Sequence, residues 1–124
     1  MRGSRPTLVF IIVAAAAMTF TSGAEANHRT KVLCGNFSGQ GMDPHLARKP
    51  ARCDITRRRS VVELRSMRWE RWGESALGRG LVNGRLRTVH LRRRRPCGQH
   101  GQYDVYSEMM IDRKGFRPIL HCGD

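Results

Sequence analysis

Hydrophobic and polar residues alternate in two segments near the C-terminus. In residues 85–93, Val89 and Leu91 share one face, and polar or basic residues occupy the other. In residues 103–112, one face is again mostly apolar and includes Met109. The segment between them contains the glycines that a turn requires. We therefore predict that the two segments form an antiparallel hairpin.

The alternation also suggests a register for this hairpin. Val89 and Leu91 point inward together with Met109 and Ser107 if Val89 lies opposite Met109 and Leu91 opposite Ser107. The same register predicts three further facing pairs, namely His90 with Glu108, Arg94 with Asp104, and Arg92 with Tyr106. A slip of one residue would turn the apolar side chains to solvent, so we expect a firmly set register.

Residues 60–73 fit two patterns. Their apolar positions recur every third residue up to Met67, as in a helix, whereas Met67 and Trp69 alternate as in a strand. Elsewhere, turn signals recur about every ten residues, Gly78-Arg79-Gly80 and Asn83-Gly84 among them. This spacing is typical of all-β folds. We predict a strand for residues 60–73 and, for the domain, a small, disulfide-stapled antiparallel sandwich or barrel.

The N-terminus carries the three parts of a secretory signal peptide. Arg2 and Arg5 precede an uncharged apolar run over residues 8–20, and Ala24-Glu25-Ala26 provides a cleavage site. The apolar run is shorter than the roughly 20 residues that span a bilayer. We expect residues 1–26 to be removed, with Ala24 as the second choice of site. The mature chain should be secreted and extracellular, without a transmembrane anchor.

The mature chain divides into a loop-rich N-terminal arm (27–52) and a β-rich domain (53–124). Its four cysteines are Cys34, Cys53, Cys97 and Cys122. An even number of cysteines in an exported protein predicts two disulfides, with the pairing left open. Cys97, His100, His121 and Cys122 could alternatively hold a zinc ion. Because export favours oxidation, we predict disulfides, with neither a metal nor another cofactor.

The formal net charge is +13, and all but three of the 23 basic residues are arginine. Arginine suits contacts with phosphate, sulfate or carboxylate groups, so anionic polymers or an acidic protein are the expected partners. The same composition also marks a GC-rich genome. Two clusters are candidate anion-binding sites: Arg57, Arg58 and Arg59, and Arg92, Arg93, Arg94 and Arg95. Strand alternation would divide the second cluster between two faces, so the first is the stronger candidate.

An ordered set of short motifs runs from about Ala51 to Pro118. The motifs are Cys53-Asp54, the W-x-x-W-G of Trp69 to Gly73, Gly78 to Gly80, Val89 to Leu91, and Cys97-Gly98 before Tyr103. This order resembles that of small secreted proteins from GC-rich Gram-positive bacteria. The resemblance implies a secreted β-rich domain and brings no catalytic residue with it.

No catalytic residue is predicted. A small secreted ribonuclease would need a carboxylate, a histidine and arginines. The residue types are present in Glu63, Glu70, Glu74, His90, His100 and His121, but any basic protein with five histidines would provide them. Trp69 and Trp72 suit a stacking platform or, as we prefer, the core. We expect a non-enzymatic binding domain. The alternative is a hydrolase inhibitor that uses an exposed loop at residues 113–117.

Overall fold

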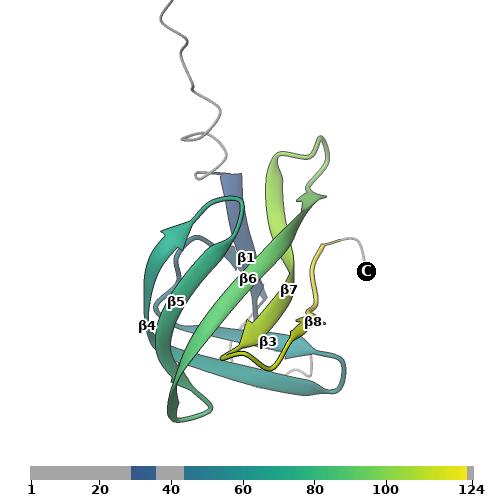
Figure 1. Ribbon diagram of the computed structural model, residues 1–124. Coiled ribbons are helices and arrows are strands. Elements are labelled where there is room, and N and C mark those ends of the chain that lie inside the picture. Colours follow the sequence, from purple (N-terminus) through teal and green to yellow (C-terminus); the bar gives the residue numbers. More distant parts are fainter. Residues whose placement is uncertain (1–28, 36–43, 123–124) are drawn as a thin grey trace, which may run out of the picture.

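Eight strands make up most of the chain that the structure describes, which is residues 29–35 and 44–122 of a computed structural model (Figure 1). The strands are β1 (Thr30–Cys34), β2 (His45–Ala47), β3 (Cys53–Arg57), β4 (Ser60–Trp72), β5 (Ala76–Val82), β6 (Arg85–Cys97), β7 (Tyr103–Ile111) and β8 (Phe116–Pro118). The all-β prediction is confirmed. The predicted signal peptide, residues 1–26, lies outside the described residues.

The strands form one curled sheet in the order β2-β1-β7-β6-β5-β4-β3, with β8 paired to β7 (Figure 1). Every pair is antiparallel except β1 with β7, which is parallel. β1 and β2 lie in the segment that the sequence predicts to be a loop-rich arm. Their strand structure depends on β7, far along the chain, so local patterning gave little sign of it.

The curl brings β1 and β3 together at a seam. The Cys34–Cys53 disulfide crosses this seam, with Cα atoms 5.0 Å apart. Beside it, the Gly35 amide donates to the Asp54 carbonyl at 2.8 Å. A second disulfide, Cys97–Cys122, ties the end of β6 to the C-terminal segment. The prediction of two disulfides is therefore confirmed, and the two sulfurs of the alternative zinc site are bonded to each other.

The core fills the inside of the curl. Its centre is an edge-on stack of Trp72 against Tyr106, with ring centroids 5.3 Å apart. The Trp72 indole donates to the Thr30 carbonyl at 2.8 Å, which links β4 to β1. The Tyr106 hydroxyl donates to the Gly73 carbonyl and accepts a hydrogen bond from the Gly73 amide. Tyr106 is fully buried, so these two bonds satisfy a polar group that would otherwise be costly to bury.

Two irregularities interrupt β4, and the first accounts for the three-residue spacing of the buried Leu64 and Met67. The register of β4 against β5 shifts between Arg65 and Arg68 and again between Trp69 and Arg71. A β-bulge inserts one residue and so changes which face the next side chain occupies. Trp69 and Trp72, three apart, consequently pack on each other with centroids 5.0 Å apart. The predicted strand at residues 60–73 is confirmed.

Of the two turn signals in this region, one is a turn and the other lies within a strand. Asn83 and Gly84 connect β5 to β6, and both have positive φ, as a tight hairpin turn requires. Gly78 lies in the middle of β5, so the turn predicted at Gly78-Arg79-Gly80 is wrong. A Cβ on Gly78 would lie 2.5 Å from the Trp69 ring. This glycine is needed for the close approach of the indole rather than for a turn.

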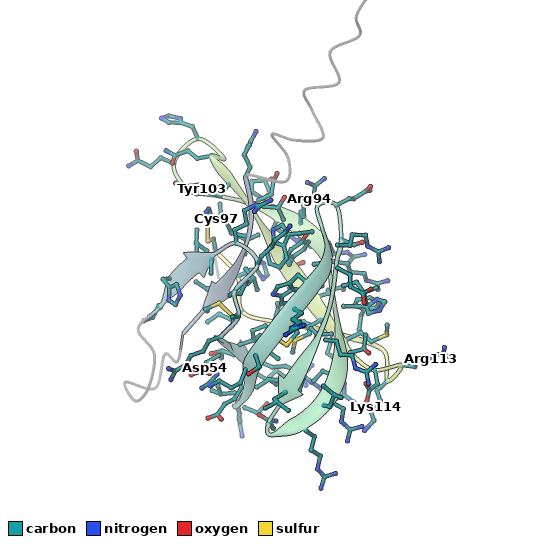
Figure 2. All side chains as sticks on the ribbon, turned by 90° about the vertical axis from the view of Figure 1, so that its left-hand side faces the viewer. Asp54, Arg94, Cys97, Tyr103, Arg113 and Lys114 are labelled. Carbon is teal, nitrogen blue, oxygen red and sulfur yellow. A yellow bond between two sulfur atoms is a disulfide. The ribbon has the colours of Figure 1, made fainter. Side chains whose placement is uncertain are left out.

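The predicted β6–β7 hairpin is confirmed, but its register differs by two residues. Val89 pairs with Ile111, and Leu91 pairs with Met109. A shift of two keeps the same side chains inside, so alternation alone did not distinguish the two registers. The predicted facing pairs are wrong: His90 faces Met110, Arg94 faces Tyr106, and Arg92 faces Glu108. β6 also continues through Pro96 to Cys97, toward the end of the molecule that carries Tyr103 in Figure 2.

We predict that the two disulfides contribute unequally to stability. Chain entropy alone gives about 3 kcal/mol for each, because the loops are similar in length. Cys34 and Cys53 are both fully buried at the seam, however, so replacing both by alanine also leaves a gap in the core. The Cys34→Ala/Cys53→Ala protein should therefore have the lower free energy of unfolding in denaturant titrations. The matched control is Cys97→Ala/Cys122→Ala, and equal losses would contradict the role of the seam.

We also predict that Tyr106→Phe lowers the free energy of unfolding by about 1–3 kcal/mol, because it removes the donor to the Gly73 carbonyl, whereas the Gly73 amide keeps its bond to the Ser75 carbonyl at 3.1 Å. Burial raises the pKa of Tyr106 to about 12. Since this pKa exceeds that of an unfolded tyrosine, about 10, the wild-type protein should lose stability as the pH rises from about 10 to 12. Unfolding titrations across this range should show a smaller loss in Tyr106→Phe than in Tyr103→Phe.

Candidate anion-binding site

The first arginine cluster lies on a tight turn between β3 and β4. Arg57 pairs with Ser60, so only Arg58 and Arg59 form the turn itself. The Ser60 hydroxyl donates to the Arg57 carbonyl at 3.0 Å, which closes the turn from the side chain. The turn therefore holds three consecutive arginines at a fixed place on the edge of the sheet.

Arg58 adopts a backbone conformation that is unfavourable for an arginine. Its φ is 52°, in the left-handed region that favours glycine or asparagine. This conformation costs a residue with a Cβ roughly 1–2 kcal/mol. Strained residues of this kind concentrate at functional sites. At the position of Arg58, a glycine or an asparagine would therefore make the turn more stable than the arginine does.

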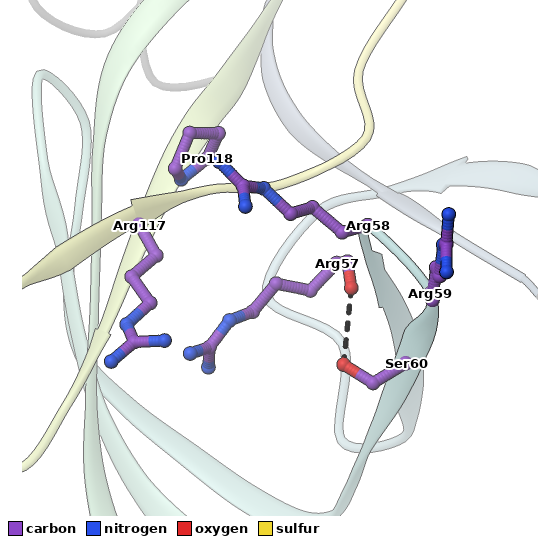
Figure 3. A pocket seen from close by; sticks show the side chains of 6 residues that line it. All are labelled: Arg57, Arg58, Arg59, Ser60, Arg117 and Pro118. Carbon is purple, nitrogen blue, oxygen red and sulfur yellow. Dashed lines mark hydrogen bonds between the residues drawn. The ribbon is translucent and has the colours of Figure 1, made fainter.

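Arg117 joins this cluster from β8. The pocket that results, which we term the arginine pocket, is lined by Arg57, Arg58, Arg59, Ser60, Arg117 and Pro118 (Figure 3). The guanidinium groups of Arg57 and Arg117 point toward one another, whereas the Arg59 side chain points away from them (Figure 3). The Leu120 amide donates to the Thr56 carbonyl at 2.8 Å and so fixes the C-terminal segment beside β3.

The arginine pocket concentrates positive charge. No carboxylate of the described residues lines it, and none forms an ion pair with Arg57 or Arg117. Burial lowers the pKa of the half-buried Arg57, and the positive charge of Arg117 lowers it further. Both side chains are guanidinium groups, which carry a positive charge in proteins at neutral pH. The two cations are therefore held close together without a compensating charge from the described residues.

The second arginine cluster differs from the first, because its members have partners. Glu108 accepts from Arg92 Nε at 2.8 Å and from Arg93 Nη1 at 3.4 Å. The Arg92 guanidinium also lies over the Phe116 ring, 3.6 Å from its centroid. Arg94 donates to the Thr30 hydroxyl at 3.2 Å. This cluster is largely tied to its own sheet.

The division of the second cluster by simple strand alternation is wrong. Arg93 has a φ of 59° and is not paired with a β7 residue in the regular ladder. Because the strand is irregular there, Arg92 and Arg93 reach the same carboxylate instead of facing opposite ways. Arg95 is exposed. Among the four, none contributes to the arginine pocket.

Arg117 lines the arginine pocket but belongs to neither of the two arginine clusters that the sequence suggested as anion-binding sites. It appears in the sequence only as part of the exposed loop suggested for an inhibitor, residues 113–117. The structure places Arg113 and Lys114 on the turn between β7 and β8 and Arg117 in the pocket. The usable signal was the neighbouring glycine turn, since Gly115 with φ of 91° allows the chain to fold back along β7.

The residues considered for a ribonuclease come from several parts of the fold. Glu63 and Glu70 belong to β4 and His90 to β6. His90 lies edge-on to Phe116, and His121 Nδ1 lies 3.0 Å from the Ile119 carbonyl. Over residues 29–35 and 44–122, no three His, Cys, Asp or Glu side chains gather in a way that could hold a metal ion.

The two tryptophans pack inward. Trp72 belongs to the buried core, and Trp69 packs against that core while donating its indole hydrogen to the Pro50 carbonyl at 2.8 Å. Neither ring is presented as an open stacking surface.

Comparison with protein-family models, with curated proteins and with solved structures finds no match to this chain. Within the two described stretches of the chain, no helix is long and apolar enough to cross a membrane.

We predict that Arg58→Asn stabilises the fold while weakening anion binding. Asparagine tolerates the left-handed conformation, so the free energy of unfolding should rise by about 0.5–1 kcal/mol. The matched control is Arg59→Asn, which removes the neighbouring charge at a residue without positive φ. Thermal or denaturant unfolding of the two variants measures the difference. A less stable Arg58→Asn protein would contradict the strain at this turn.

Proposed function

We propose that this protein is an exported, non-enzymatic domain that binds anionic polymers through the arginine pocket. One observation carries the proposal: arginines from two separate elements converge there, and the described residues provide no carboxylate to balance them. Holding Arg57 beside Arg117 costs electrostatic energy in the free protein. A bound anion would remove that cost, which favours binding.

The ion pairs elsewhere in the sheet support this assignment. Asp54 binds Arg65 at 2.7 Å, Asp112 binds Arg87 at 2.9 Å, and Glu108 binds two arginines. The fold thus provides carboxylates for Arg65 on β4 and for Arg87, Arg92 and Arg93 on β6, but not for the arginines in the pocket. An uncompensated group of arginines is the arrangement that an external polyanion would complete.

The accessibility of the pocket suits a polymer. Arg58, Arg59 and Arg117 are exposed, so a flexible chain can reach them without rearrangement of the sheet. Export is supported by the two disulfides, which are typical of oxidising compartments.

We predict steeply salt-dependent binding. For about three contacts, the slope known for duplex DNA, about −0.9 per contact, corresponds to roughly a 40-fold loss of affinity between about 50 and 200 mM salt. Arg57→Gln/Arg117→Gln should reduce the slope of log affinity against log salt by about two. Calorimetric or fluorescence titration with polyphosphate, dextran sulfate and polyglutamate provides the measurement.

Arg79→Gln/Arg95→Gln is the matched control for this experiment. It removes the same charge from exposed positions on β5 and β6, outside the pocket. If both double variants lose affinity equally, binding depends on net charge and not on the pocket. If the wild-type protein binds none of the three polymers at low salt, the proposed function is wrong.

A further inference from the structure

We infer that Arg57 and Arg117 together take a tetrahedral oxyanion, a phosphate or sulfate group carried on the polymer, in preference to a carboxylate. This inference rests on the proposed function and specifies the chemical group that the arginine pocket recognises.

The first argument is the arrangement of the hydrogen-bond donors. Figure 3 shows the two guanidinium groups pointing toward one another from different elements, Arg57 from the end of β3 and Arg117 from β8. Each guanidinium presents a planar fork of N–H donors. A carboxylate has two oxygens in one plane and forms a bidentate pair with one fork; Glu108, which accepts from two arginines, receives only one bond from each. A tetrahedral group presents oxygens on several sides, so it can accept from both forks at once.

The second argument is that the backbone fixes both arginines before a ligand arrives. Arg57 pairs with Ser60 in the β3–β4 ladder, and Arg117 pairs with Met109 in the β7–β8 ladder. The Leu120 amide donates to the Thr56 carbonyl at 2.8 Å, which joins β3, one residue before Arg57, to the segment that follows β8. Binding therefore requires no ordering of the backbone at either arginine, and only the two side chains remain to be ordered around the anion.

The third argument concerns which donors remain for a ligand. The Ser60 hydroxyl already donates to the Arg57 carbonyl at 3.0 Å, so its hydrogen is used within the turn. The guanidinium groups therefore provide the recognition. Two facing cations also favour an anion that contacts both of them over one that neutralises a single fork.

The test compares three polymers of matched charge number at one salt concentration: polyphosphate, dextran sulfate and polyglutamate. The wild-type protein should bind at least one of the two tetrahedral polymers about tenfold more tightly than polyglutamate, since two bidentate contacts replace one. The tetrahedral polymer that binds more tightly shows whether the pocket prefers phosphate or sulfate groups. Binding of polyglutamate as tight as that of both other polymers would overturn the inference.

Arg57→Lys/Arg117→Lys separates geometry from charge, because lysine keeps the positive charge and loses the fork. The preference over polyglutamate should fall from about tenfold to about twofold or less, while salt-dependent binding persists. Arg58→Lys/Arg59→Lys is the matched control and should keep the preference. If Arg57→Lys/Arg117→Lys keeps the full preference over polyglutamate, that result also contradicts recognition by the two guanidinium groups. In both contradicting cases the proposed function survives, whereas failure of all three polymers to bind at low salt removes both.

Discussion

The seam between β1 and β3 closes the curled sheet, although these strands share no regular ladder. The closure consists of the buried Cys34–Cys53 disulfide and a hydrogen bond from the Gly35 amide to the Asp54 carbonyl at 2.8 Å. The Thr56 hydroxyl adds a bond to the Gly35 carbonyl at 3.2 Å. A regular antiparallel pair would provide hydrogen bonds along its whole length. Because this seam has few, the covalent link has a larger share in holding the two edges together and keeping the core out of water.

The arginine pocket depends on the same seam. Thr56 bonds to the end of β1 through its hydroxyl and to the C-terminal segment through its carbonyl. The next residue is Arg57, and the C-terminal segment follows directly on the strand that carries Arg117. Closing the sheet therefore brings together two charged residues 60 positions apart in the sequence. Without the seam, the turn of three arginines would remain, but its opposing guanidinium would not.

Local patterns predicted most of the fold and about half of the site. Alternation located β6 and β7, and Asn83-Gly84 located a turn, because both signals act between near neighbours. Alternation of hydrophobic and polar residues does not reveal the parallel β1–β7 pair or the two-residue shift of the β6–β7 register. Both depend on partners that are distant in the sequence. The turn arginines were visible as a run, whereas Arg117 was not, since β8 must first fold back on β7. Likewise, Gly78 was mistaken for a turn residue because nothing in the sequence shows that the Trp69 ring lies against it.

Arginine richness by itself does not distinguish function from compositional drift, but individual positions do. Drift adds arginine without regard to its surroundings, and most positions on a β-sheet surface tolerate it. At Arg58 the backbone has a φ of 52°, so selection for stability alone would favour glycine or asparagine. At Arg57 the side chain is half-buried beside Arg117, where a neutral residue would avoid both desolvation and repulsion. Arg57 and Arg58 thus both carry a charge at a cost to the stability of the fold. By contrast, Arg92 and Arg93 form ion pairs with Glu108, and Arg93, which also has a positive φ of 59°, therefore has a partner within the fold. The physical case for function therefore rests on Arg57 and Arg58, which have no carboxylate partner among the described residues and which both line the arginine pocket.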